Sequence, residues 1–152
     1  VIQDIRIGKG RIIKKGKGLA ILGLGTRVGA ALKVADNLSQ NNIKITVADA
    51  RFAKPIDTEL LEKLWNEHQK LIIIEEGSAG GFSSHCLHFL SSKDLLNKHD
   101  KEIKCLTMPD NFQDHASQKE QLAKAGLDTD GLMKVVSKMI PLSNVKNKSI
   151  IN

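Results

Sequence analysis

The stretch LAILGLGT, residues 19–26, decides the fold of this chain. Its apolar first half is short and bounded by turn residues, which is typical of a buried strand. Gly23 and Gly25 then allow a sharp turn, because glycine tolerates positive φ. Apolar residues follow at helical spacing, namely Val28, Ala31, Leu32, Ala35 and Leu38. The stretch therefore predicts a strand, a tight turn and a helix.

Further strand signals extend outward from this unit on both sides. Short apolar or β-rich segments predict strands, in chain order, within residues 5–17 and at 43–50, 71–74 and 103–108. The first of these is interrupted by glycine and lysine, which is typical of a sheet edge, where lysine discourages unwanted pairing. Strands that alternate with helices indicate a parallel sheet with helices on both faces. The expected fold class is therefore α/β.

Capping residues mark where the later helices begin and end. Asp57 and Asp128 are suited to be N-caps, because an aspartate side chain can accept backbone N–H groups. Gly126 can end a short helix at residues 118–125, and Pro141 can end the last one. Helices are expected from the first turn as far as 39–42, from 57 through 65, around 82–90, at 118–125 and from 128 to 140.

The composition is that of one globular domain. The chain has 152 residues, of which 41% are hydrophobic and 26% are charged, and its net charge is +6. Aromatic residues make up only 3%, so the stacking platform of a single-strand nucleic-acid binder is not expected. No apolar run approaches membrane-spanning length. Cys86 and Cys105 are far apart in the chain, and we expect them to be reduced and structural in a cytoplasmic protein.

We expect a single domain over residues 1–140 and a polar, basic tail at 141–152. The chain does not begin with Met, and we expect it to be a piece of a longer protein. The segments that alternate along it show no internal repeat and no low-complexity region.

One motif suggests a nucleotide. Gly23-x-Gly25 follows a strand and Asp49 ends the next strand, which resembles the dinucleotide-binding fingerprint. The third glycine position holds Val28, however, which would keep the helix away from the strand and obstruct the pyrophosphate. A structural turn and a nucleotide site using Gly23, Gly25 and Asp49 are the two interpretations.

Two adjacent acids stand at the end of a predicted strand, beside a glycine-rich loop. Glu75 and Glu76 could serve in acid–base chemistry, but neighbours in a strand point to opposite faces, so they would not act on one atom. The helix after Gly80-Gly81 could offer its N–H groups to an anion. In the simpler interpretation, loop amides or a partner chain satisfy both carboxylates.

Other chemistry-bearing residues form no recognisable set. The five histidines have no metal-ligand spacing; His85 and His88 could share a helical face, but no third ligand is close in sequence. The serines near 78–84 lack a nucleophile-elbow context. We therefore expect no catalytic, cofactor-binding or metal-binding residue in this chain.

Four segments together carry a family resemblance. These are IGKGRIIKKGKGLAILGLGT, VADARFAKPID, EEGSAGGFSSH and MPDNFQDHASQKEQLAKAGLD, which span the chain from residue 7 to about 140. In order and spacing they resemble the C-terminal domain of the 1-deoxy-D-xylulose-5-phosphate synthases. ARFAKPID and EEGSAGGF also resemble the broader transketolase family and the β subunits of 2-oxoacid dehydrogenases, whereas the last segment points to the synthases.

The resemblance implies a three-layer α/β/α domain with a five-stranded, mostly parallel sheet and one antiparallel edge strand near Ile12. It implies a full enzyme, a homodimer, that condenses pyruvate with glyceraldehyde 3-phosphate, releases carbon dioxide, and feeds isoprenoid and thiamine biosynthesis. Thiamine diphosphate and Mg²⁺ would be bound outside this chain, which would be inactive alone. It would pack against the other domains through loops such as residues 75–81.

Two alternatives stay open beside this resemblance. The first is the stand-alone nucleotide-binding domain with Gly23, Gly25 and Asp49. The second is a subunit-docking module, as in the β subunits of 2-oxoacid dehydrogenases, whose equivalent domain docks on an acyltransferase core.

Overall fold

The stretch at residues 19–26 lies at the centre of a five-stranded sheet. A computed structural model describes residues 5–97, 100–111 and 115–140. Strand β2 (Leu19–Gly23) is buried along its whole length. It runs parallel to β3 (Thr46–Asp49) on one side and to β4 (Lys70–Ser78) on the other. A run of buried apolar residues with no polar alternation is what a strand covered on both faces requires.

The strand order is β1-β3-β2-β4-β5. Strand β1 (Arg11–Lys14) pairs antiparallel with β3 at one edge, and β5 (Glu102–Met108) pairs parallel with β4 at the other. The predicted five-stranded, mostly parallel sheet with an antiparallel first strand is confirmed. Two strand boundaries differ from the expectation by three or more residues. β3 begins at Thr46, because the N–H of Ile43 bonds to Leu38 O at the end of the preceding helix, and β4 continues to Ser78.

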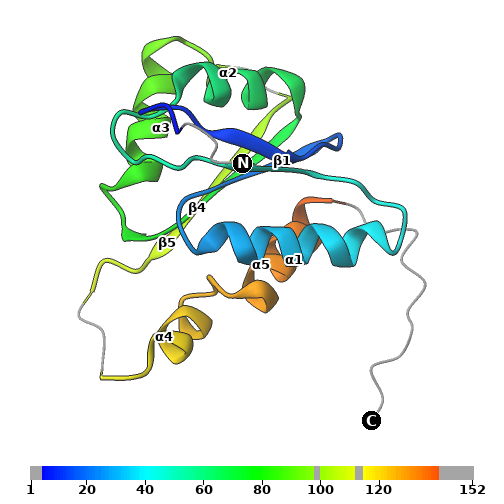
Figure 1. Cartoon of the computed structure of the whole chain (residues 1–152), viewed down its shortest axis with the longest axis vertical. Coiled ribbons are helices and arrows are strands. Elements are labelled where there is room, and N and C mark those ends of the chain that lie inside the picture. The colour runs from blue at the N-terminus through cyan, green and yellow to red at the C-terminus, as the bar shows by residue number, and fades with distance from the viewer. Residues whose placement is uncertain (1–4, 98–99, 112–114, 141–152) are drawn as a thin grey trace.

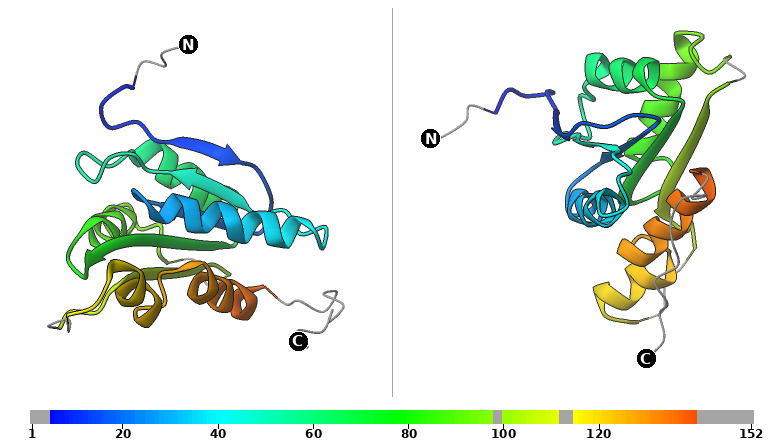
Figure 2. Two further views of the ribbon diagram at one scale, coloured as in Figure 1. Left: turned by 60° about the horizontal axis from the view of Figure 1, so that its bottom comes forward. Right: turned by 90° about the vertical axis from the view of Figure 1, so that its right-hand side faces the viewer.

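Helices cover both faces of the sheet (Figures 1 and 2). Helices α1 (Arg27–Ser39) and α5 (Thr129–Met139) pack on one face, and α2 (Thr58–Glu67) and α3 (Phe82–Ser92) on the other. The short α4 (Gln118–Lys124) has no fully buried residue and follows the α5 side of the molecule. The predicted α/β/α layering is therefore confirmed.

The expected caps are present. Asp57 accepts the N–H of Leu60 at 3.1 Å, and Asp128 accepts the N–H of Gly131 at 2.8 Å. Gly126 follows the end of α4 with a φ of +69°, a conformation that glycine adopts without steric cost. α4 also begins with a capping box between Ser117 and Glu120, which the sequence analysis had not singled out.

Two apolar clusters hold the layers together, one on each face of the sheet. The α1–α5 side buries Ile21, Val34, Ile72 and Val136, and the α2–α3 side buries Leu22, Leu64, Ile73 and Leu90. Trp65 is buried in the second cluster, and its indole N–H donates to Leu95 O at 2.9 Å. Each fully buried aliphatic side chain stabilises the fold by about 1.5–3 kcal/mol.

Among the helices that the structure describes, none combines the length and apolarity needed to cross a membrane. Helix α5 ends at Met139. The predicted basic tail at 141–152, and Pro141 as the residue that ends the last helix, lie outside the described residues.

Candidate functional site at the carboxyl edge of the sheet

The carboxyl ends of β2, β3, β4 and β5 meet at one edge of the sheet. The chain leaves β2 toward β3 on one side and later returns to β4 on the other side. In open parallel sheets such a reversal of strand order creates the crevice where ligands bind. Residues 23–27 and 75–81 contain the carboxyl ends of the two strands that border this crevice and the turns after them, so they form the candidate site.

Glu75 points inward, toward the start of α3. The residue is only 3% exposed. Its carboxylate accepts the backbone N–H of Phe82 at 3.1 Å and that of Ser83 at 2.5 Å. The N-cap of α3 is Gly81, which has no side chain to do this. The first-turn amides that could have bound an external anion are therefore taken by a carboxylate of the same chain, and the simpler interpretation of Glu75 is confirmed.

The Glu75 carboxylate lies so close to two glycines that a side chain at either position would collide with it. A Cβ atom on Gly77 would lie 2.5 Å from Glu75 Oε1, and one on Gly81 would lie 2.6 Å from the same atom. Neither distance is compatible with a real side chain while the carboxylate keeps its place. Gly77 and Gly81 therefore allow the chain to pass close to the Glu75 carboxylate.

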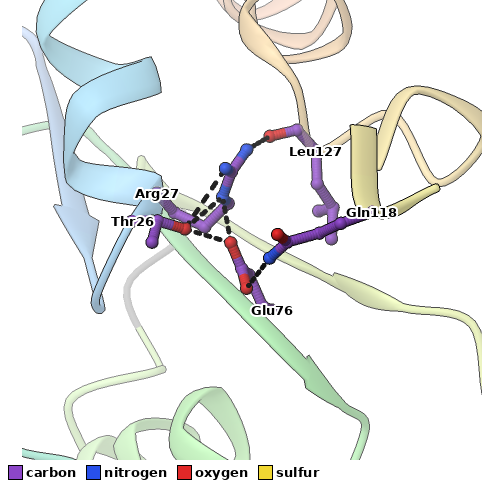
Figure 3. A network of polar contacts seen from close by, with 5 residues as sticks. All are labelled: Thr26, Arg27, Glu76, Gln118 and Leu127. Atoms are coloured by element: carbon purple, nitrogen blue, oxygen red, sulfur yellow. Dashed lines mark hydrogen bonds and ion pairs between the residues drawn. The ribbon is translucent and has the colours of Figure 1, made fainter. Parts of the chain in front are cut away.

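Glu76 points to the opposite side of the strand, as the alternation of strand neighbours requires. Its Oε1 accepts the hydroxyl of Thr26 and lies 3.1 Å from Nε of Arg27. Its Oε2 accepts from Nε2 of Gln118 at 3.3 Å. The two neighbouring acids therefore belong to separate networks, and the prediction that their side chains point to opposite faces is confirmed. Figure 3 shows the second network.

Arg27 is the centre of that network, and the sequence analysis missed it. Its side chain is 11% exposed, and its Nη1 donates to Leu127 O at 2.5 Å. Nε and Nη2 also reach Oγ1 of Thr26 at 3.3 and 3.2 Å. One guanidinium thus ties the start of α1 to β4 and to the turn before α5 (Figure 3). We call the group Thr26, Arg27, Glu76, Gln118 and Leu127 the Arg27 clasp.

The residues of the nucleotide-like motif lie together, but with partners of their own. Asp49 Oδ1 accepts the N–H of Arg51 at 3.0 Å, and Oδ2 lies 3.4 Å from Nε of Arg11. Gly25 has a φ of +64°. Gly23 packs against Val28, since a Cβ there would lie 3.1 Å from Cγ2 of the valine. This close contact of strand and helix accounts for Gly23, and the turn accounts for Gly25, without a nucleotide. The expectation that Val28 would keep the helix away from the strand is therefore wrong.

Of the remaining candidates, His68 and the two cysteines have surroundings that indicate a structural role. His68 is buried; its Nδ1 lies 2.9 Å from Leu64 O and its Nε2 lies 2.7 Å from Oγ1 of Thr46. Within residues 5–97, 100–111 and 115–140, no three metal-ligating side chains gather into a site. No disulfide joins Cys86 to Cys105. Burial raises the pKa of the Cys86 thiol to about 12 and also raises the pKa of Cys105, so both are poor nucleophiles.

Comparison with known proteins shows which family has this architecture. The family model described as transketolase, C-terminal domain, matches residues 8–132. A solved split-gene transketolase, described as an inactive β4 tetramer, is similar with a TM-score of 0.76 and 28% sequence identity. The similarity covers 89% of this chain but 43% of that one, so this chain spans less than half of that protein's length. The chain belongs to the transketolase C-terminal domain family.

Proposed function

We propose that this chain is the C-terminal domain of a 1-deoxy-D-xylulose-5-phosphate synthase. The support comes from the segment that points to the synthases, MPDNFQDHASQKEQLAKAGLD at residues 108–128. Its described part supplies Gln118 and the Leu127 carbonyl to the Arg27 clasp. The segment that points to the synthases thus packs on the EEGSAGGF segment that is common to the wider family.

The domain's role in this proposal is to form an interface rather than to catalyse. The observation that carries this proposal is that both carboxylates at the crevice already have partners within the domain. Glu75 accepts the first-turn N–H groups of α3, and Glu76 is held by the other members of the Arg27 clasp. Residues 77–80, at the end of β4 and in the loop that follows it, are exposed. We infer that this exposed, internally braced loop packs against other domains of the same enzyme.

Thiamine diphosphate and Mg²⁺ are the cofactors that the proposed enzyme requires. The residues described here do not fit that group, because a diphosphate-bound Mg²⁺ needs free oxygen ligands. The two acids of the crevice already accept hydrogen bonds from protein groups. We propose that the cofactors are held by the other domains of a cytoplasmic homodimer. The tetrameric description of the split-gene transketolase supports assembly with further copies.

The test is the activity of the native protein that contains this chain. An antibody against the 152-residue chain would be used to precipitate the protein from its source cells. The precipitate would be assayed for release of carbon dioxide from pyruvate, with and without glyceraldehyde 3-phosphate. We expect release that depends on glyceraldehyde 3-phosphate and yields 1-deoxy-D-xylulose 5-phosphate.

Two further assays on the same precipitate separate the alternatives. Ketol transfer between sugar phosphates, with no decarboxylation of pyruvate, would identify a transketolase and overturn the proposal. Retention of an acyltransferase core would identify a 2-oxoacid dehydrogenase subunit. An immunoblot band near 16.7 kDa, with no larger species, would mean that the domain acts without the catalytic domains and would also refute the proposal.

A further inference from the structure

A second hollow lies at the carboxyl ends of β2 and β3. It has a volume of about 520 Å³ and is lined by Ile5, Arg11, Gly25, Asp49, Arg51 and Phe52. None of these residues belongs to the Arg27 clasp. Pockets for small molecules usually occupy about 300–1,000 Å³, with apolar walls and a few well-placed polar groups. The volume of the hollow lies in that range, and its apolar side is formed by the half-buried Phe52 and by Ile5, which is 62% exposed.

The polar groups of this pocket carry an excess of positive charge. Two guanidinium groups, of Arg11 and Arg51, share it with the single carboxylate of Asp49. Arg11 lies 3.4 Å from that carboxylate. The side chain of Arg51 has no hydrogen bond or ion pair with any part of the chain that the structure describes, although the residue is half-buried. A bound anion would supply the counter-charge that this guanidinium lacks among the described residues.

The backbone holds Arg51 at this position despite a steric cost. Its φ is +59°, a left-handed conformation that is uncommon for residues other than glycine and costs on the order of 1 kcal/mol. Asp49 fixes the turn by accepting the N–H of Arg51 at 3.0 Å. Gly25 contributes no side chain, and a Cβ there would meet nothing within 4 Å. The turn and the missing side chain of Gly25 therefore leave Arg51 on the wall of the pocket, where its side chain has no partner among the residues that the structure describes.

We propose that this pocket binds a small organic anion, a phosphate monoester or a carboxylate, with Arg51 as the main contact to its oxygens. An arginine suits this ligand because its planar fork can donate two parallel hydrogen bonds to an oxyanion. Arg11 adds a second positive charge, and Phe52 and Ile5 offer an apolar surface to the organic part. This site stands whether or not the chain is part of a synthase.

Titration of the 152-residue chain with defined probes tests the site. Glycerol phosphate, inorganic phosphate and citrate would be added at constant ionic strength while backbone amide resonances are followed by NMR. We expect saturable shifts at Gly25, Arg51 and Phe52, with a dissociation constant on the order of 1 mM for at least one probe. Organic phosphate should bind more tightly than inorganic phosphate, since only it reaches the apolar wall.

Three variants make the test specific. Arg51→Gln should weaken binding at least about tenfold, whereas Arg51→Lys, which keeps the charge and loses the fork, should weaken it about threefold. Lys104→Gln removes an exposed lysine of β5, far from the pocket in the sheet order, and should leave binding unchanged. The side chain of Arg51 has no partner to lose within the described part of the chain, so its variants should melt like the parent chain.

Several results would overturn the proposal. One is the absence of saturable binding for every probe up to tens of millimolar. Another is an equal loss of affinity in Arg51→Gln and Lys104→Gln, which would indicate diffuse attraction to a basic protein. A third is unchanged anion binding in Arg51→Gln. If that variant also loses its association with neighbouring domains, Arg51 belongs to a polypeptide interface instead.

Discussion

Removing the charge of Glu75 should destabilise the whole domain. This carboxylate is buried, and its two oxygens accept the first-turn N–H groups of Phe82 and Ser83. The substitution Glu75→Gln keeps the size of the side chain. It replaces one acceptor oxygen with an NH₂ group, which points a donor at an N–H donor. It also removes the negative charge from the positive end of α3.

The magnitude follows from these two losses. A hydrogen bond to a charged group contributes about 1.5–3 kcal/mol, and a buried charge at a helix end contributes up to about 2 kcal/mol. The neutral amide costs less to bury than a carboxylate, which offsets part of the loss. We therefore expect the free energy of unfolding to fall by about 2–3 kcal/mol, out of a total of about 5–15 kcal/mol for a domain.

Urea unfolding followed by circular dichroism measures this change, with Glu62→Gln as the matched control. Glu62 is exposed on α2, so its substitution should change stability by no more than about 0.5 kcal/mol. Native-state hydrogen exchange adds a local readout, because the amides of Phe82 and Ser83 should exchange faster in Glu75→Gln. A loss below about 0.5 kcal/mol, or unchanged exchange at these amides, would refute the reasoning.

Three further predictions concern the same chain. Gly81→Ala should lower the free energy of unfolding by about 1–3 kcal/mol, because its Cβ would lie 2.6 Å from Glu75 Oε1. Gly29→Ala on α1, where a Cβ would meet open space, should raise the free energy of unfolding by up to about 1 kcal/mol. Cys86, with a pKa of about 12, should resist iodoacetamide at pH 8 until the chain is unfolded, as mass spectrometry would show. Its raised pKa also means that stability is constant below the unfolded-state pKa and falls as pH rises above it. The Ser117 hydroxyl lowers the pKa of Glu120. Protection of the amides at the start of α4 from exchange should therefore be present above the pKa of Glu120 in the unfolded state and be lost as the pH falls through its pKa in the folded state. In Glu120→Gln this protection should not change with pH over the same range.

The sequence predicted those features whose causes are local. An aspartate three residues before an N–H donor can cap a helix wherever the rest of the chain lies, so Asp57 and Asp128 were identified correctly. The same holds for the end of α4 at Gly126. The central strand was also predictable, because residues 19–23 have no polar alternation.

The Arg27 clasp could not be predicted in this way, because its partners are distant in the chain. Arg27 bonds to a carbonyl 100 residues away and to an acid 49 residues away. One signal was present in retrospect: Arg27 occupies the first turn of α1, where a cation is unfavourable and no acid is found. A basic residue in that place needs a counter-charge from elsewhere. The resemblance of the segment at 108–128 to the synthases gave no hint that it would supply part of the clasp.

The pair Glu75 and Glu76 is the physical basis of our proposal that this edge packs against other domains rather than catalyses. Because strand neighbours alternate, one acid braces α3 on one side of the sheet and the other joins the Arg27 clasp on the opposite side. To use either as an acid or base, the protein would have to give up hydrogen bonds that hold a helix in place. The exposed residues 77–80, at the end of β4 and in the loop after it, follow directly after these two acids. A loop fixed at its start on both faces changes little when a partner binds, so little conformational entropy is lost on association.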